Sequence, residues 1–345
     1  MQEAAVRKNI LDFTPEELAE IVTDLGGQKF RAAQVFGWLS KGVAGYDEMT
    51  NVPKSLRGKL EVEYLIGLPD AVRMQESKDG TVKCLFRFTD GAEVESVFMR
   101  YEYGNSICIS SQSGCRMGCR FCASTMDGLD RSLTGGEMLG QVLAMRNLTG
   151  SYIGHVVIMG MGEPFDNYEE ASRFIRLIHD SKGYDLGLRN ITVSTCGIIP
   201  KIRQFAEDFP QVNLAVSLHA PNQEIRQKSM PVAGKYGYED LMDACREYTE
   251  TTGRRITFEY AVIDGFNDSA ECAEELAGRL KGWLTHVNLI PLNEVEGRSY
   301  KTANGKNVKR FKDILEKNGV AVTVRRTLGN DIDAACGQLR RRHAG

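Results

Sequence analysis

Three cysteines lie close together in the sequence, at Cys115, Cys119 and Cys122, with the spacing CxxxCxxC. Thiolates are soft ligands that suit iron–sulfur clusters or zinc. A 4Fe–4S cluster held by only three cysteines leaves one iron with an open coordination site, which can chelate a small ligand. Zinc is the alternative, but structural zinc sites usually pair two matched CxxC elements, and the sequence has no second pair. The motif therefore predicts a 4Fe–4S cluster.

A second group of candidate residues follows expected strands further along the chain. In the segment Met159–Pro164, Gly162 permits close backbone approach and Glu163 offers an acceptor for an ammonium group. The other members of the group come at or just after strand ends: Ser194, Ser217, Leu218, His219 and Asn293. Each polar residue alone could merely satisfy loop backbone groups. Their shared position favours a pocket for the ribose and carboxylate of a cofactor.

Two further cysteines could react. Cys336 lies near the end of the chain, and Cys108 lies in an expected strand. The alternative for either cysteine is burial as a small hydrophobic residue. Glu95 lies in a β-rich run twenty residues before Cys115, and from the sequence alone it is expected to be a solvated strand residue. For four other cysteines we expect packing alone: Cys84, Cys196, Cys245 and Cys272.

The elements that must position these residues alternate along the chain. Six apolar strand candidates cover residues 107–110, 155–159, 190–194, 212–217, 256–262 and 287–290. Helical spacing follows them at residues 136–148, 168–180, 199–207, 238–251, 270–280 and 308–318. Right-handed βα units of this number predict an α/β fold, a partial six-stranded (β/α)6 TIM-like barrel whose reactive groups gather at the C-terminal strand ends.

The chain ahead of this barrel divides into two parts. Thr14, Pro15 and Glu17 predict a capped helix start, and residues 1–70 are expected to form a small helical domain. Residues 71–104 are expected to form a β-rich extension with hairpin turns at Asp79-Gly80 and Asp90-Gly91. The barrel then spans residues 105–330, and residues 331–345 form a C-terminal segment that carries Cys336.

The bulk properties limit the class of protein. The 345 residues carry a net charge of −3, which argues mildly against nucleic acid as a partner, yet basic residues cluster locally. The clusters are Lys54, Arg57 and Lys59; Lys306, Lys309 and Arg310; Arg325 and Arg326; and Arg340, Arg341 and Arg342. No apolar run is long enough to span a membrane and no signal peptide is visible, so we expect a cytoplasmic protein.

Several motifs together resemble one family. The segments SSQxGC with CxxxCxxC, MGMGEP, SLHAPN and DIDAACGQL look like those of the RlmN/Cfr family of RNA adenine methyltransferases, within the radical S-adenosylmethionine (radical SAM) superfamily. The resemblance covers nearly the whole chain. It implies a 4Fe–4S cluster on Cys115, Cys119 and Cys122, with S-adenosylmethionine on the open iron and in the pocket described above.

The resemblance also implies a reaction that uses two molecules of S-adenosylmethionine per turnover. Cys336 first accepts a methyl group by nucleophilic displacement. A 5′-deoxyadenosyl radical from the second molecule then removes hydrogen from this methyl group, and the carbon radical adds to adenine. Glu95 corresponds to the proposed proton acceptor, and Cys108 to the thiol that releases the product by forming a disulfide with Cys336.

Within the family, methylation occurs at C2 or at C8 of adenine. Pro164 and the segment Ala220-Pro221-Asn222 favour C2. The implied substrates are an adenosine of the peptidyl-transferase centre in 23S rRNA and the adenosine 3′ to the anticodon in tRNAs. The implied partners are these RNAs and an electron donor such as flavodoxin or ferredoxin, with the enzyme a monomer. The alternatives are Cfr-like C8 methylation, or an iron–sulfur protein that binds RNA or relays electrons without methylating.

Overall fold

The N-terminal part of the chain is a small group of helices. The structure is a computed structural model that describes residues 7–326, 328, 332 and 339. The helices are η1 (Ile10–Asp12), α1 (Pro15–Asp24), α2 (Arg31–Leu39), η2 (Tyr46–Glu48) and α3 (Lys54–Glu63), and a short parallel pair, β1 (Lys8–Asn9) with β2 (Tyr64–Leu65), closes the group. The predicted capping box is present at α1: the Thr14 hydroxyl accepts from the Glu17 amide, and the Glu17 carboxylate accepts from the Thr14 amide.

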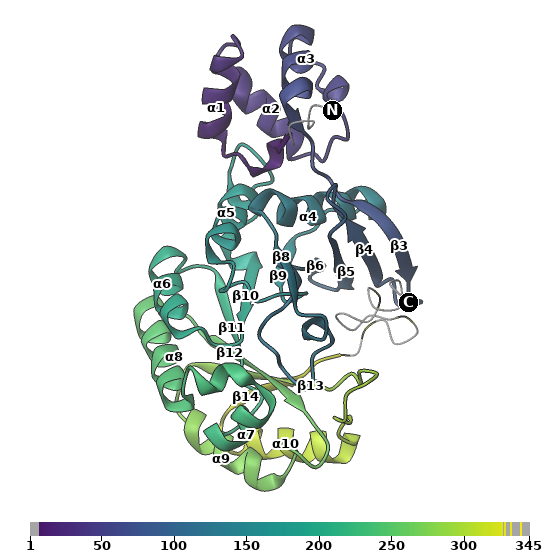
Figure 1. The fold of residues 1–345 in the computed structure, drawn as a ribbon. Helices are drawn as coiled ribbons and strands as arrows, with labels where there is room; N and C mark the ends of the chain where they lie inside the picture. Colours follow the sequence, from purple (N-terminus) through teal and green to yellow (C-terminus); the bar gives the residue numbers. More distant parts are fainter. Residues whose placement is uncertain (1–6, 327, 329–331, 333–338, 340–345) are drawn as a thin grey trace.

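One ten-stranded sheet forms the rest of the framework (Figure 1). Its antiparallel part consists of β3 (Asp70–Glu76), β4 (Val82–Arg87) and β5 (Glu93–Tyr101), and β5 pairs with β6 (Gly104–Ile109). From β6 onward the strands are parallel: β9 (His155–Ile158), β10 (Ile191–Thr195), β11 (Asn213–Ser217), β12 (Ile256–Val262), β13 (Thr285–Pro291) and β14 (Ala321–Val324). The six predicted barrel strands are confirmed, and β14 is an additional parallel strand that the sequence did not predict.

Helices follow the parallel strands as expected. They are α4 (Gly135–Thr149), α5 (Tyr168–His179), α6 (Ile199–Asp208), α8 (Tyr238–Thr252), α9 (Ala270–Leu280) and α10 (Gly305–Lys317). Two short elements after β11, α7 (Gln223–Ser229) and η5 (Pro231–Gly234), were not predicted. In Figure 1 the helices α5, α6, α8, α9 and α10 line the outside of the curved sheet. Among the described helices, none is both long and apolar enough to cross a membrane.

The two faces of the sheet differ in character. Alternate residues such as Ile107, Ile109 and Ile158 belong to the large hydrophobic core beneath the helices. The residues between them point to the inside of the open barrel, where Cys108 packs against Val97 in a separate small cluster. Because side chains alternate along a strand, each barrel strand contributes to both the core and the interior. The interior is therefore available for a site.

The helical N-terminal group docks against α4 and α5. The Asp12 carboxylate accepts from the backbone amide of Gly136 at 2.9 Å, at the start of α4. Arg173 of α5 donates to the Asp12 carbonyl at 3.0 Å and forms an ion pair with Glu17 at 2.8 Å. These contacts join the two parts on the side of the barrel shown at the top of Figure 1.

Candidate active site

A cavity with about 640 Å³ of empty space opens at the C-terminal ends of β9, β10 and β11. Its walls include these residues predicted from the sequence: Cys115, Cys119, Cys122, Gly162, Glu163, Ser194, Ser217 and His219. A second cavity of about 810 Å³ shares Cys122, Ser194, Ser217 and His219 and is lined as well by Asn293. Segments far apart in the sequence thus meet in one space.

The cysteines lie in a loop that a small hairpin closes. The strands β7 (Gln112–Gly114) and β8 (Leu129–Ser132) pair antiparallel on either side of it, and the Cys115 amide donates to the Gly128 carbonyl at 2.8 Å. Gly114 has a φ of +79°, and a Cβ at this position would lie 2.1 Å from the Gly128 carbonyl oxygen. Only glycine fits the closure of this loop.

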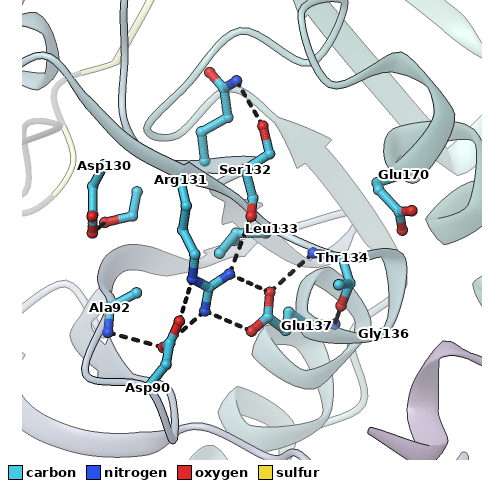
Figure 2. Close-up of polar contacts among 12 residues, drawn as sticks. Asp90, Ala92, Asp130, Arg131, Ser132, Leu133, Thr134, Gly136, Glu137 and Glu170 are labelled. Carbon is cyan, nitrogen blue, oxygen red and sulfur yellow. Dashed lines mark hydrogen bonds and ion pairs between the residues drawn. The ribbon is translucent and has the colours of Figure 1, made fainter. Parts of the chain in front are cut away.

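Arg131 anchors β8 to the rest of the barrel. Its guanidinium donates to both carboxylate oxygens of Glu137 at 2.7 Å and to the Asp90 carboxylate at 2.9 Å, so that it lies between the two acids in Figure 2. Burial opposes this charge, but the bonds to Glu137 and Asp90 outweigh burial and raise the pKa of Arg131. The same Glu137 completes the capping box of α4 with Thr134. The base of the cysteine loop is therefore tied to the start of a barrel helix and to the turn before β5.

Side chains at the tip of the loop contact the barrel rim. The ring of Phe121 meets His219 edge-on, with the ring centroids 4.9 Å apart. Thr125 donates to the carbonyls of Cys119 and Cys122 at 3.1 and 3.2 Å, and Arg298 donates to the Thr125 hydroxyl at 3.1 Å. The loop conformation thus depends on its own backbone and on a residue beyond β13.

Burial decreases the acidity of the loop cysteines. Burial raises the pKa of the Cys115 thiol to about 12, and burial together with the neighbouring thiols holds the pKa of Cys119 well above its ordinary value. Within the described part of the chain, no group of three His, Cys, Asp or Glu side chains is arranged to hold a metal ion. A 4Fe–4S cluster is several ångströms across, so its cysteines need not converge on one point. Such thiols would release protons on binding it.

A buried cation behind the cavity wall points to an anionic group there. Arg226 of α7 is fully buried, and its Nη2 donates to the carbonyls of Cys196 at 2.6 Å and Ser217 at 3.3 Å. Its Nε and Nη1 have no hydrogen-bond partner among the described residues. A buried guanidinium with orphaned donors is costly unless an anion compensates it. A cluster bound on cysteine thiolates would carry such a negative charge.

The segment with Glu163 is joined to the start of the cysteine loop. The amides of Ser111 and Gln112 donate to the Met161 carbonyl at 2.9 and 3.2 Å, and the Glu163 amide donates to the Gln112 side chain at 2.9 Å. Gly162 has a φ of +101°, and a Cβ there would lie 2.6 Å from Gln112 Cβ. The close approach that the sequence suggested for this glycine is therefore present.

The Glu163 carboxylate is buried and already accepts backbone donors. These are the amides of Phe165 at 3.0 Å and Cys196 at 2.7 Å. Burial raises the pKa of Glu163, and these bonds oppose the rise. The carboxylate faces the cavity and could accept hydrogen bonds from an ammonium group.

His219 is buried as a neutral imidazole. Its Nδ1 accepts from the Ala261 amide at 2.9 Å, so the proton lies on Nε2. Burial, helped by the charge of Arg226, lowers the pKa of His219 to about 3. Its backbone has a φ of +54°, which is uncommon for a residue with a side chain. The ring can donate one hydrogen bond toward a ligand but carries no charge.

The remaining predicted residues lie elsewhere. The Leu218 side chain packs in the main core, so only its backbone is near the rim. Cys108 lies on the inner face of β6, in a cluster with Met159, which lines both cavities. Glu95 lines neither cavity, and the expectation of a solvated residue is wrong, because it is buried and forms an ion pair with Lys83 at 2.8 Å. Cys336 falls outside the described residues.

Sequence reasoning missed four residues near the site. Cys196, which we expected only to pack, lines the first cavity beside Cys119. Glu259 and Arg325 line the second cavity, and burial raises the pKa of Glu259. Arg226 lies behind the wall. The only available signal was position, since Cys196 and Glu259 belong to strand segments whose ends meet at the barrel mouth.

The basic clusters have different environments. In the first, Arg57 and Lys59 donate to backbone carbonyls of Asp47 and Leu25, which is a structural role. In the second, Lys306, Lys309 and Arg310 line a shallow hollow on α10. Arg325 of the third lines a cavity, as noted above. The cluster at 340–342 falls outside the described residues.

The chain matches two protein-family models. Residues 109–276 match the radical SAM superfamily, and residues 8–66 match the N-terminal domain of the ribosomal RNA large subunit methyltransferase. The first match contains the cysteine loop and the Glu163 segment, and the second covers the helical N-terminal group.

Similar proteins match nearly the full length. A probable dual-specificity RNA methyltransferase RlmN from Lachnoclostridium phytofermentans is 52% identical, over 99% of this chain and 96% of the relative. A protein of the same description from Clostridium novyi is 50% identical, over 97% and 98% of the two chains. The crystal structure of a radical SAM methyltransferase from Sphaerobacter thermophilus superposes with a TM-score of 0.92 at 45% identity, covering 96% of this chain and 98% of the other.

Proposed function

Because this chain belongs to the RlmN family of the radical SAM superfamily, we propose that it is an RNA methyltransferase that methylates C2 of adenosine. Its substrates are an adenosine in the peptidyl-transferase centre of 23S rRNA and the adenosine 3′ to the anticodon in tRNAs. The observation that carries this proposal is the meeting of the three loop cysteines with Glu163 in one cavity at the strand ends. The alternatives are methylation at C8 and an iron–sulfur protein that does not methylate RNA, and experiment can distinguish them from C2 methylation.

Several residues of the cavity would hold the cofactors. Cys115, Cys119 and Cys122 would bind a 4Fe–4S cluster, and Glu163 would accept the amino group of S-adenosylmethionine. The rest of S-adenosylmethionine would contact the side chains of Ser194, Ser217, His219 and Asn293 and the backbone at Gly162 and Leu218. When bound, the cluster and S-adenosylmethionine supply the radical that starts the chemistry. The electrons come from a donor such as flavodoxin or ferredoxin. We propose that each turnover uses two molecules of S-adenosylmethionine.

The chain's own reactive groups are two thiols and a carboxylate. We assign methyl carriage to the Cys336 thiol and product release to Cys108, which would end the cycle in a disulfide with Cys336. The position of Cys108 on the inner face of β6, packed with Met159, supports its access to the barrel interior. The role of proton acceptor falls to Glu95. Lys83 contacts its carboxylate at 2.8 Å and orients it.

The architecture suits a large substrate. The sheet ends at β3 on one side and β14 on the other, so the barrel is open among the described strands. An open side allows a nucleotide to enter while the rest of the RNA stays outside. We assign residues 1–70 as an accessory helical domain, 71–104 as a β-extension, 105–330 as the barrel and 331–345 as the segment that carries the methyl group. The basic residues on α10 and Arg325 are candidates for phosphate contacts.

The test is a reconstituted reaction with methyl-labelled S-adenosylmethionine. After incubation without RNA, digestion and mass spectrometry should find the label on the peptide that contains Cys336. C336A should carry no label and make no product, whereas C272A, which removes a cysteine outside the cavity, should behave like the unsubstituted protein. With RNA, chromatography against 2-methyladenosine and 8-methyladenosine standards should find the 2-methyl product.

Each outcome supports one hypothesis about the function. An 8-methyl product would support the Cfr-like alternative. Full activity in C336A would refute methyl carriage by this thiol. A reconstituted protein that holds iron and sulfide but never methylates RNA would favour the electron-relay alternative, and zinc in place of iron would refute the cluster.

A further inference from the structure

Arg226 is a permanent charge buried beside the cysteine cavity. Its side chain is fully buried on the short helix α7, and its Nη2 joins the ends of β10 and β11 through the carbonyls of Cys196 and Ser217. A guanidinium stays protonated in proteins, so burial lowers the pKa of Arg226 without discharging it. The fold therefore keeps a positive charge in a dry environment.

Among the described residues, the largest electrostatic effects on Arg226 after burial come from groups that are not carboxylates. The groups that most favour the charge of Arg226 are the thiols of Cys196, Cys119 and Cys245 and the phenol of Tyr238. All four are neutral when protonated. Among the described residues, two of the three guanidinium nitrogens, Nε and Nη1, find no hydrogen-bond partner. A buried charge without a compensating partner is strongly destabilising.

The field of Arg226 reaches the cavity. Its guanidinium donates to the carbonyls of Cys196 and Ser217, and its charge lowers the pKa of His219. All three residues line the cavity. The cation thus acts on the space where the proposed function puts a cluster.

We propose that Arg226 is the counter-charge of the 4Fe–4S cluster and raises its reduction potential. This inference rests on the proposed cluster. The charges of three thiolates exceed the positive charge of the oxidised cluster core, so the assembly is anionic, and one-electron reduction adds a further negative charge. A fixed cation nearby favours the reduced form, because net charge, hydrogen bonds and exposure set cluster potentials.

The competing explanation is purely structural. Arg226 could serve only to cap the carbonyls at the ends of β10 and β11. A lysine can supply the charge and donate to a carbonyl, whereas a methionine of similar length supplies neither. Comparison of R226K with R226M therefore tests the charge, and R203M is a matched control that removes an exposed arginine paired with Glu247 on the surface.

The experiment is a potentiometric titration of the reconstituted proteins with dithionite, followed by electron paramagnetic resonance, without RNA. In each case one electron passes from dithionite to the cluster and no bond breaks. R226M should lower the equilibrium constant for reduction at least tenfold, which is about 59 mV for a one-electron couple. R226K should keep most of the potential, and R203M should leave it unchanged. An unchanged potential in R226M, or equal shifts in R226K and R226M, would overturn the inference.

Iron content separates failure of the inference from failure of the proposed function. If R226M loses iron after reconstitution while R226K retains it, the need for charge is supported without a potential. If both lose iron equally, with unfolding temperatures unchanged, the charge is irrelevant. If the unsubstituted protein itself takes up no iron, the proposed cluster fails, and with it the inference.

Discussion

The buried ion pair between Lys83 and Glu95 allows a stability prediction. Lys83 on β4 is fully buried, Glu95 on β5 is 3% exposed, and Nζ lies 2.8 Å from Oε2. At this distance the attraction is about 6 kcal/mol for an effective dielectric constant of about 20. Desolvation of both groups offsets much of it, so the pair as a whole contributes little, but removal of one partner leaves a buried charge.

The predicted effect of K83M is a loss of about 3–5 kcal/mol in the free energy of unfolding. For a chain of 345 residues, an unfolding entropy of about 2.1 cal/mol/K per residue converts this loss to a fall of about 4–7 °C in Tm. E95M should cost a similar amount, because it leaves Lys83 buried without this carboxylate. The double variant K83M/E95M should recover most of the stability, since neither charge remains.

Thermal unfolding followed by circular dichroism checks this prediction. K228M is the control, because it breaks an exposed ion pair with Glu224 one turn along α7 and should leave Tm unchanged. A Tm of both single variants equal to that of K228M would refute the predicted cost of a buried unpaired charge. A double variant as unstable as the single variants would show that side-chain shape, and not charge, sets the cost.

The remaining predictions concern the cavity. G162A should weaken binding of S-adenosylmethionine at least tenfold by calorimetry, since its backbone is at φ +101° and its Cβ would clash with Gln112; G150A, at φ +61° with open space around it, should bind normally. R131M should lower the iron retained after reconstitution several-fold, because β8 loses Asp90 and Glu137, whereas R87M, which breaks an exposed pair with Glu93, should retain it. The pKa of His219 is lowered to about 3, so its neutral form contributes stability above about pH 6.5 that is lost as the pH falls toward 3. Its NMR signals should therefore not titrate from about pH 5 to about pH 8. A titration midpoint near 6.5 would contradict its burial.

Much of the fold could be read from local pattern. The capping box at Thr14, the six barrel strands and the helices after them depend on neighbours within a few residues, so the sequence predicts them directly. Strand β14 was missed because it has only four residues, each of them exposed or half-buried. The short helix α7 has only seven residues, too few for a long periodic stretch of its own.

The candidate site was predictable to the extent that strand ends share one edge. Parallel strands bring their C-terminal ends together, so Glu163, Ser194 and His219 could be expected beside the cysteine loop. The environment of a group could not be expected in this way. Glu95 gave no sign of its pairing with Lys83, because their contact depends on the register of β4 against β5.

The sequence by itself determined the chemistry of the three cysteines, the order of strands and helices, and the family. These properties depend on residue type and short spacing. Only the tertiary structure decided which groups are buried and which groups lie close to a charge. It placed Arg226 behind the cavity wall, among the thiols of Cys196, Cys119 and Cys245, and brought Cys196 beside Cys119. The physical reason is that burial and electrostatic fields arise from segments far apart in the chain, and these segments come together only when the chain folds.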